Sequence, residues 1–155
     1  MSIKTILWPT DLSSHSKKAI SQVVSLSEKY GAQVVVLYAS VDLCSYFPAY
    51  GKYPGTAMLN DFRDWAVEHA RAALNKLCEN ELKSCPEIRI RLAQGDPVEA
   101  ILEHVGKEKA DLIVMSTHGL GLEKRGGTPS GLGSVTDRIV KNSPVPVHLI
   151  NPLES

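Results

Sequence analysis

Two short runs of apolar residues constrain the fold of this chain more than any other feature of its sequence. One is Val34 to Leu37, at the centre of a predicted strand over Gln33 to Ala39, and the other is Asp111 to Met115. Such runs are typical of central parallel strands, which are covered on both faces of a sheet. Neighbouring parallel strands need long crossover connections, so the sequence predicts helices between the strands.

The rest of the chain supplies those helices and the remaining strands. Further strands are predicted over Ile3 to Trp8, Ile88 to Leu92 and Val147 to Ile150. Helices are predicted from Ser13 or Ser14 to Gly31, from Ala57 to about Ser84, from Asp96 as the cap, and from Ser134 as the cap to Pro144. Five strands that alternate with four helices predict an α/β fold with an open, doubly wound sheet.

Two of these elements lead to further expectations. The strand over Ile88 to Leu92 alternates apolar residues with arginines, as an edge strand with one solvated face does. In the long helix, residues at intervals of three and four predict the buried face: Leu59, Phe62, Ala66, Ala70, Ala73 and Leu77. His69 borders that face, and we expect a packed or half-exposed histidine rather than a metal ligand.

Composition and charge argue against several classes of protein. The 155 residues suit one domain, over residues 1–155, and a formal net charge of zero argues against a nucleic-acid partner. No run reaches the roughly 18 apolar residues that span a membrane, and no signal peptide precedes the first strand. We therefore expect a cytoplasmic protein without a membrane partner.

The three cysteines Cys44, Cys78 and Cys85 form neither a disulfide framework nor a metal site by their spacing, although a redox role for one of them stays open.

Two loops have more than one interpretation. Residues 40–56 are expected to form a loop that concentrates large aromatic side chains. This loop is interpreted as a lid, as a partner surface or as a cap folded over the core. The aromatic residues of this loop are Tyr46, Phe47, Tyr50 and Tyr53. In a second loop, the Lys124–Arg125 pair either reaches bound phosphates as cations or lies at a solvated loop tip.

The segment from Asp111 to Ile150 has the clearest functional pattern. Its strand ends in a tight turn over Ser116 to Gly119, a long glycine-rich loop follows, and Gly133 precedes a new helix. Glycine lets backbone N–H groups approach a ligand closely, and a helix N-terminus attracts negative charge. The arrangement predicts a site for an anion such as phosphate; the alternative is a surface loop that binds nothing.

Two familiar phosphate motifs do not match this segment. A Walker A loop needs Lys and then Ser or Thr after its last glycine, whereas Leu132 and Gly133 follow Gly131. A dinucleotide fingerprint needs a third glycine three residues after the second, and Lys124 stands there after Gly121. The chain is therefore neither a conventional P-loop NTPase nor a conventional NAD-binding protein.

The segment does resemble the ATP-binding motif of the universal stress protein family. That motif is a Gly-x-x-Gly turn, a spacer, and then Gly-Ser or Gly-Thr; Ser116 to Gly119 matches its first part and Gly133-Ser134 its last. Ser116 replaces the first glycine, and the spacer is longer than in the family. Because the resemblance covers nearly the whole chain, the protein is identified as a UspA-like member with one domain and a variant motif.

The resemblance implies a Rossmann-like fold similar to that of adenine nucleotide alpha hydrolases, with strand order 3-2-1-4-5 and helices on both faces. The implied cofactor is ATP or AMP, with or without Mg²⁺. Asp11 would contact the nucleoside, the Ala39 backbone would read the adenine, and His118 would neighbour the phosphates or only brace its turn. The implied nucleotide-binding residues are Pro9, Thr10, Asp11, Ala39, Met115, Ser116, His118, Gly119, Gly133, Ser134 and Val135.

Three functions follow from these expectations. The first is a nucleotide-binding regulator of the stress response that forms a homodimer through the strand Val145 to Ile150. The second is a stress-family protein that binds no nucleotide and works through protein contacts. The third is a slow ATPase or phosphotransferase, which we do not favour because Asp11 is the only obvious carboxylate near the site apart from Glu123 in the loop.

Overall fold

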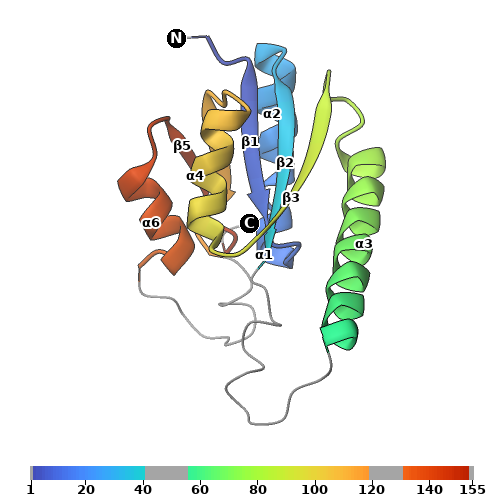
Figure 1. Cartoon of the computed structure of the whole chain (residues 1–155). Helices are drawn as coiled ribbons and strands as arrows, with labels where there is room; N and C mark the ends of the chain where they lie inside the picture. The colour runs from blue at the N-terminus through green and yellow to red at the C-terminus, as the bar shows by residue number, and fades with distance from the viewer. Residues whose placement is uncertain (1, 41–55, 119–130, 154–155) are drawn as a thin grey trace.

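The computed structural model describes residues 2–40, 56–118 and 131–153. The described strands are β1 Thr5–Thr10, β2 Gln33–Ser40, β3 Ile88–Gln94, β4 Leu112–Ser116 and β5 Val147–Ile150. The described helices are α1 Ser14–Lys17, α2 Ile20–Tyr30, α3 Thr56–Glu81, α4 Pro97–Lys107 and α6 Ser134–Asn142. The strand pairs are parallel and the sheet order is β3-β2-β1-β4-β5 (Figure 1), which confirms the predicted fold.

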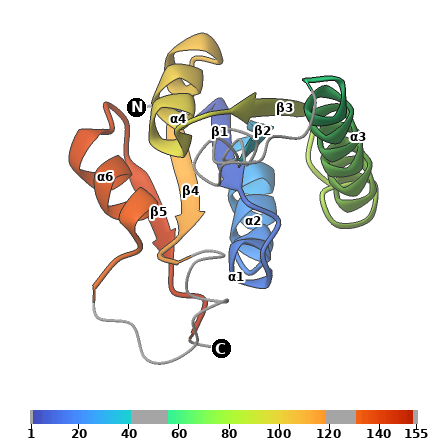
Figure 2. The same cartoon turned by 60° about the horizontal axis from the view of Figure 1, so that its bottom comes forward.

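Helices cover both faces of this sheet (Figure 2). On one face, the fully buried Trp8 of β1 belongs to the same apolar cluster as Leu74 of α3. On the other face, Leu7 of β1 belongs to a second cluster with Ile101 of α4 and Ile139 of α6. Successive residues of a strand point to opposite faces, so a central strand must be apolar throughout. The apolar run Val34 to Leu37 accordingly lies inside β2, and the run Asp111 to Met115 covers most of β4.

The connection after β1 is built from local caps. The Ser13 side chain accepts a hydrogen bond from the Ser16 amide at 3.1 Å and caps α1, as predicted. Gly31 ends α2 with φ of 63°, the left-handed conformation that glycine adopts without strain. The single predicted helix is in fact two, α1 and α2, because the chain leaves the helix at Lys18 and Ala19.

β3 lies at one edge of the sheet, as its alternating pattern predicts. Its two arginines are not simply solvated. Arg91 Nε lies 2.6 Å from Glu108 Oε1, and Arg89 Nη1 lies 3.6 Å from Glu108 Oε2. Because Glu108 directly follows α4, these ion pairs tie the edge strand β3 to the C-terminal end of α4.

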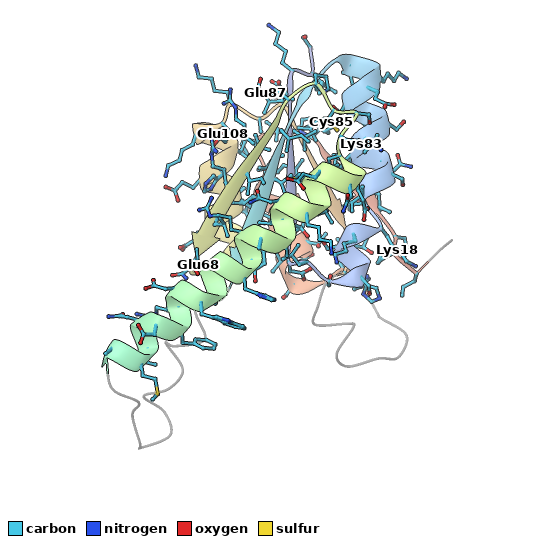
Figure 3. The ribbon with its side chains drawn as sticks, turned by 90° about the vertical axis from the view of Figure 1, so that its right-hand side faces the viewer. Lys18, Glu68, Lys83, Cys85, Glu87 and Glu108 are labelled. Carbon is cyan, nitrogen blue, oxygen red and sulfur yellow. The ribbon has the colours of Figure 1, made fainter. Side chains whose placement is uncertain are left out.

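The long helix α3 is packed along only part of its length. Leu74 and Leu77 are buried against the sheet, but Phe62 is 42% and Trp65 is 59% exposed. The prediction that Phe62 lies on the buried face is therefore wrong, and Ala73 is exposed as well. Figure 3 shows this first half of α3, which contains Glu68, extending past the sheet. Helical spacing shows that a face is apolar, but it does not show that another element lies against it.

His69 lies at the middle of α3. Its ring stacks on that of Trp65, with centroids 5.1 Å apart. The residue is exposed, and one face of its ring packs on that of Trp65. Among the helices that the structure describes, none is long and apolar enough to cross a membrane.

Candidate functional site

The carboxyl ends of three neighbouring strands meet at one edge of the sheet. β1 stays in register with β2 to its own end, where Thr10 pairs with Tyr38, two residues before the end of β2. The ladder between β1 and β4 stops earlier, at Leu7 and Ile113. β1 and β4 are also the pair at which the order of the sheet reverses. Ligands of open α/β folds bind at such a switch point, outside the carboxyl ends of the strands.

The turn after β1 is closed by its own side chains. Thr10 is buried, and its hydroxyl accepts a hydrogen bond from the Leu12 amide at 3.0 Å and also bonds to the Ser16 hydroxyl. Asp11 Oδ1 accepts a hydrogen bond from the Ser13 amide at 3.0 Å. Leu12 has φ of 62°, a left-handed conformation that these contacts support. One oxygen of Asp11 thus helps to hold the start of the helix.

Asp11 also lies near the end of β2. Burial raises the pKa of the Tyr38 phenol, and the negative charge of Asp11 raises that pKa further. Tyr38 is followed by Ala39, the residue whose backbone was expected to read the adenine. The structure therefore brings Asp11 and the end of β2 to the same edge of the sheet, as the sequence predicted.

The turn after β4 is held by hydrogen bonds to distant parts of the chain. Met115 and Ser116 are buried at the end of β4. The Ser116 hydroxyl donates to the His118 carbonyl at 2.7 Å, so the side chain is turned back into its own turn. The Ser116 carbonyl accepts a hydrogen bond from the Thr136 hydroxyl at 3.0 Å, and the Thr117 amide donates to the Ile150 carbonyl at 2.9 Å. The Ser116 backbone thereby links β4 to α6, and its side chain, which the family glycine lacks, adds a hydrogen bond within the turn.

The described ends of the glycine-rich loop lie against this turn. The Gly133 amide donates to the Thr117 carbonyl at 2.9 Å. A Cβ atom on Gly133 would lie 3.1 Å from the same carbonyl oxygen, so the close approach leaves little room for a side chain. His118 Nε2 lies 2.8 Å from the carbonyl oxygen of Gly131. The two anchors of the predicted motif are therefore in contact. Gly119, Glu123, Lys124, Arg125 and the aromatic residues of 41–53 lie outside the described residues.

Helix α6 begins at this point of contact. Its N-cap is Gly133 rather than Ser134, and Ser134 is the first helical residue. The predicted cap is thus wrong by one residue, because the Gly133 carbonyl accepts the first bond of the helix, from the Asp137 amide at 2.8 Å. The amides of Ser134, Val135 and Thr136 precede that first donor. Such amides, together with the helix dipole, attract anions.

An ion pair joins the N-terminus of α4 to α6. Asp96, the N-cap residue of α4, receives hydrogen bonds from the Arg138 guanidinium of α6 at 3.1 and 3.3 Å. The hydrogen bond from Arg138 is the main cause that lowers the pKa of the Asp96 carboxyl. The expected cap residue is correct, but its carboxylate pairs with another helix. The sequence gives no signal for this pair, because its members lie 42 positions apart.

The described residues give little support for a metal site or for a reactive thiol. No group of three or more His, Cys, Asp or Glu side chains there could hold a metal ion. Cys78 and Cys85 are free and buried, and burial is the main cause that raises the pKa of Cys78 to about 11. A thiol with a raised pKa is a weak nucleophile at neutral pH. Cys44 lies outside the described residues.

Comparison with known sequences shows relatives over nearly the whole chain. A model of the universal stress protein family matches residues 2–151. A universal stress protein of Methanocaldococcus jannaschii is 32% identical over 150 residues, which cover 95% of this chain and 81% of that protein. Another, from the QAH/OAS sulfhydrylase 3′ region of Thermus aquaticus, is 33% identical over 147 residues, which cover 95% and 98%.

Solved structures share the fold. UspA from Lactobacillus plantarum matches with a TM-score of 0.77 and 22% identity over 97% of this chain and 99% of its own. A universal stress protein in complex with cAMP matches with a TM-score of 0.64 and 18% identity over 98% and 99%. A family protein from Arabidopsis thaliana with AMP bound matches with a TM-score of 0.57 and 20% identity over 96% and 91%.

Proposed function

Because this chain belongs to the universal stress protein family, we propose that it is a stress-response regulator that binds an adenine nucleotide, ATP or AMP. The nucleotide would lie at the carboxyl edge of the sheet, across the switch point between β1 and β4. The observation that supports this proposal most directly is the contact of Thr117 and His118 with Gly131 and Gly133, beside the first amides of α6. The contact creates a preformed anion site from two separated turns.

Each end of the nucleotide has a proposed set of contacts. The nucleoside would lie against Pro9, Thr10 and Asp11, with the adenine beside the Ala39 backbone. The phosphates would lie over Gly119 and the first turn of α6, with the Ser134 hydroxyl and the Val135 amide as donors. Met115, Ser116, His118 and Gly133 would border the site, because the Ser116 hydroxyl and the Gly133 amide already bond to the turn after β4.

Two structures of relatives support an adenine ligand. One relative was crystallised in complex with cAMP and another with AMP. Their sequence identities to this chain are 18% and 20%, so their ligands suggest a chemical class rather than one nucleotide.

The proposal is tested first on the native protein. The purified protein is denatured, the released nucleotide is assayed, and the refolded protein is titrated with ATP, AMP and cAMP by calorimetry. We expect one adenine nucleotide to bind at a single site. If nothing is released and nothing titrates, the chain works through protein contacts alone.

Two variants then locate the site. Asp11→Asn keeps an acceptor for the Ser13 amide but removes the charge, and Ser134→Ala removes an exposed hydroxyl. Each should weaken binding about fivefold to tenfold, the ratio expected for one lost hydrogen bond. Glu103→Gln, on the exposed face of α4, is the matched control and should bind as the native protein does. Equal affinity for native protein and Asp11→Asn would remove Asp11 from the site.

We also propose that the protein forms a homodimer through β5. This strand lies at an edge of the sheet, and its four residues are half-buried. The Pro146 carbonyl accepts a hydrogen bond from Ile113 of β4, and the Ile150 carbonyl accepts one from Thr117, which directly follows β4. Backbone groups of a strand alternate in direction, so those of Val147 and Leu149 point away from β4 and are available to a second copy.

The alternation gives a sharp test of that interface. Val147→Pro removes an outward N–H and leaves the ladder with β4 intact, because proline is tolerated on the free side of an edge strand. We expect a dimer for the native protein and a folded monomer for Val147→Pro, measured by gel filtration with light scattering. A native monomer at micromolar concentration would contradict the proposal.

A further inference from the structure

The imidazole of His118 bonds to this chain through both ring nitrogens. Nδ1 lies 2.9 Å from the Thr117 hydroxyl, and Nε2 lies 2.8 Å from the Gly131 carbonyl oxygen. The ring also packs over Gly133, because its Cδ2 atom lies 4.0 Å from where a Cβ would stand on that residue. Neither nitrogen is left over for a ligand in this arrangement.

These contacts fix the protons on the ring. The Gly131 carbonyl can only accept a hydrogen bond, so Nε2 must donate to it. In the neutral imidazole Nδ1 is then an acceptor, and the Thr117 hydroxyl donates to it. The neutral ring therefore bridges its own turn and the far end of the glycine-rich loop as the Nε2–H tautomer.

We propose that His118 is a positioning residue that locks the turn after β4 to the N-terminus of α6 and so presets the anion site. The proposal rests on the function proposed above. The lock joins positions 13 apart in the chain, and bringing two such positions together costs conformational entropy that the ligand would otherwise have to offset. A site that is ordered in advance binds more tightly because the ligand does not bear that cost.

The Gly131 backbone supports this role. Its φ of 80° lies in the left-handed region, where a residue with a side chain would be strained, although open space surrounds it. The glycine is thus required by conformation rather than by crowding. Its conformation directs the carbonyl that the imidazole holds.

Two substitutions of His118 separate the lock from the ring itself. The amide nitrogen of glutamine reaches about as far as Nε2 of histidine, whereas that of asparagine reaches only about as far as Nδ1. His118→Gln can keep the bond to Gly131, and His118→Asn cannot. AMP affinity, measured by calorimetry, should fall about fivefold in His118→Asn and remain clearly closer to native in His118→Gln.

Measurements without nucleotide distinguish failure of the lock from failure of the proposed function. The Gly133 amide donates to Thr117, so its hydrogen exchange reports whether the two turns stay together. We expect faster exchange at Gly133 in His118→Asn and native-like exchange in His118→Gln. Unchanged exchange in His118→Asn would overturn the lock, whether or not the native protein binds AMP.

A direct contact between His118 and phosphate is the competing role. In that case the nitrogen-15 resonances of the imidazole would move from the Nε2–H pattern when AMP is added. The lock instead predicts that this pattern is already present in the free protein and is retained with AMP. It also predicts that Thr117→Val, which removes the hydroxyl partner of Nδ1, weakens AMP binding; native-like binding by this variant would overturn the proposal.

Discussion

The two turns that face each other at the carboxyl edge of the sheet are stabilised over different ranges of sequence. In the turn after β1, the Thr10 hydroxyl bonds to a partner six positions away. In the turn after β4, the bonds of Ser116 and His118 reach 20 and 13 positions along the chain. The first turn can form from local sequence alone, whereas the second depends on the position of α6. We therefore expect the first turn to be the rigid wall of the site and the second to be the part that substitutions loosen.

The largest difference in stability should appear when one threonine in each turn is replaced by valine. Thr10→Val keeps the side-chain shape but leaves the Leu12 amide and the buried Ser16 hydroxyl without their partner. Buried groups left unpaired cost about 1–3 kcal/mol each, so we expect a loss of about 2–3 kcal/mol in the free energy of unfolding. Thr117→Val removes a half-buried hydroxyl and should cost less than about 1 kcal/mol. Urea denaturation of the two variants measures the contrast, and equal losses would refute it.

The same difference in range explains what the sequence could predict. Val34 to Leu37, the Ser13 cap and the Gly31 stop all depend on neighbours within a few residues, and they were predicted correctly. The Asp96–Arg138 pair depends on which elements become neighbours in space, which no local pattern encodes. The strand order itself came from family resemblance, because periodicity identifies strands but does not order them.

Errors at the site and in α3 have related causes. The N-cap of α6 fell on Gly133 because the close approach of Thr117 leaves little room for a side chain there, and only the folded turn shows this. Phe62 has the right spacing for a buried residue, yet no described element covers it. In both cases the local preference was sound, and the tertiary neighbours decided the outcome.

A substitution at Gly133 should give the next largest effect, and it tests the second turn directly. With φ of −59°, Gly133 has a backbone conformation that alanine tolerates, so Gly133→Ala reports the contact with Thr117 rather than strain. Overpacking typically costs about 1–3 kcal/mol, and we expect about 1 kcal/mol because the Cβ position is only slightly too close to the Thr117 carbonyl oxygen. Gly106→Ala is the matched control. Nothing lies within 4 Å of its Cβ position in α4, so this variant should be stabilised by about 0.5–1 kcal/mol.

Thermal unfolding of the two glycine variants checks that sign. We expect the midpoint temperature to fall for Gly133→Ala and to rise for Gly106→Ala. A rise for both would mean that Gly133 does not approach the Thr117 carbonyl closely in solution. The compact arrangement at the candidate site would then be ruled out, while the packing of the sheet would be unaffected.

The smallest expected effect concerns the first turn and its neighbour Tyr38. Burial, and after it the charge of Asp11, raises the pKa of the Tyr38 phenol above the ordinary value of 10.0. A raised phenol pKa stabilises the fold below about pH 10, and this contribution is lost as the pH rises through the folded-state pKa. Asp11→Asn removes the second cause, so the Tyr38 pKa should move down towards 10.0 and the loss of stability at alkaline pH should become smaller.

Ultraviolet titration of Asp11→Asn and of the native protein measures this shift, and subtraction of Tyr38→Phe isolates the signal of Tyr38 from the other tyrosines. At neutral pH the stability of Asp11→Asn should equal that of the native protein, because asparagine keeps the acceptor for the Ser13 amide. If the Tyr38 pKa does not change, the carboxylate does not lie beside the end of β2 in solution. The first turn would then be as mobile as the second, and the contrast between a rigid wall and an adjustable one would not hold.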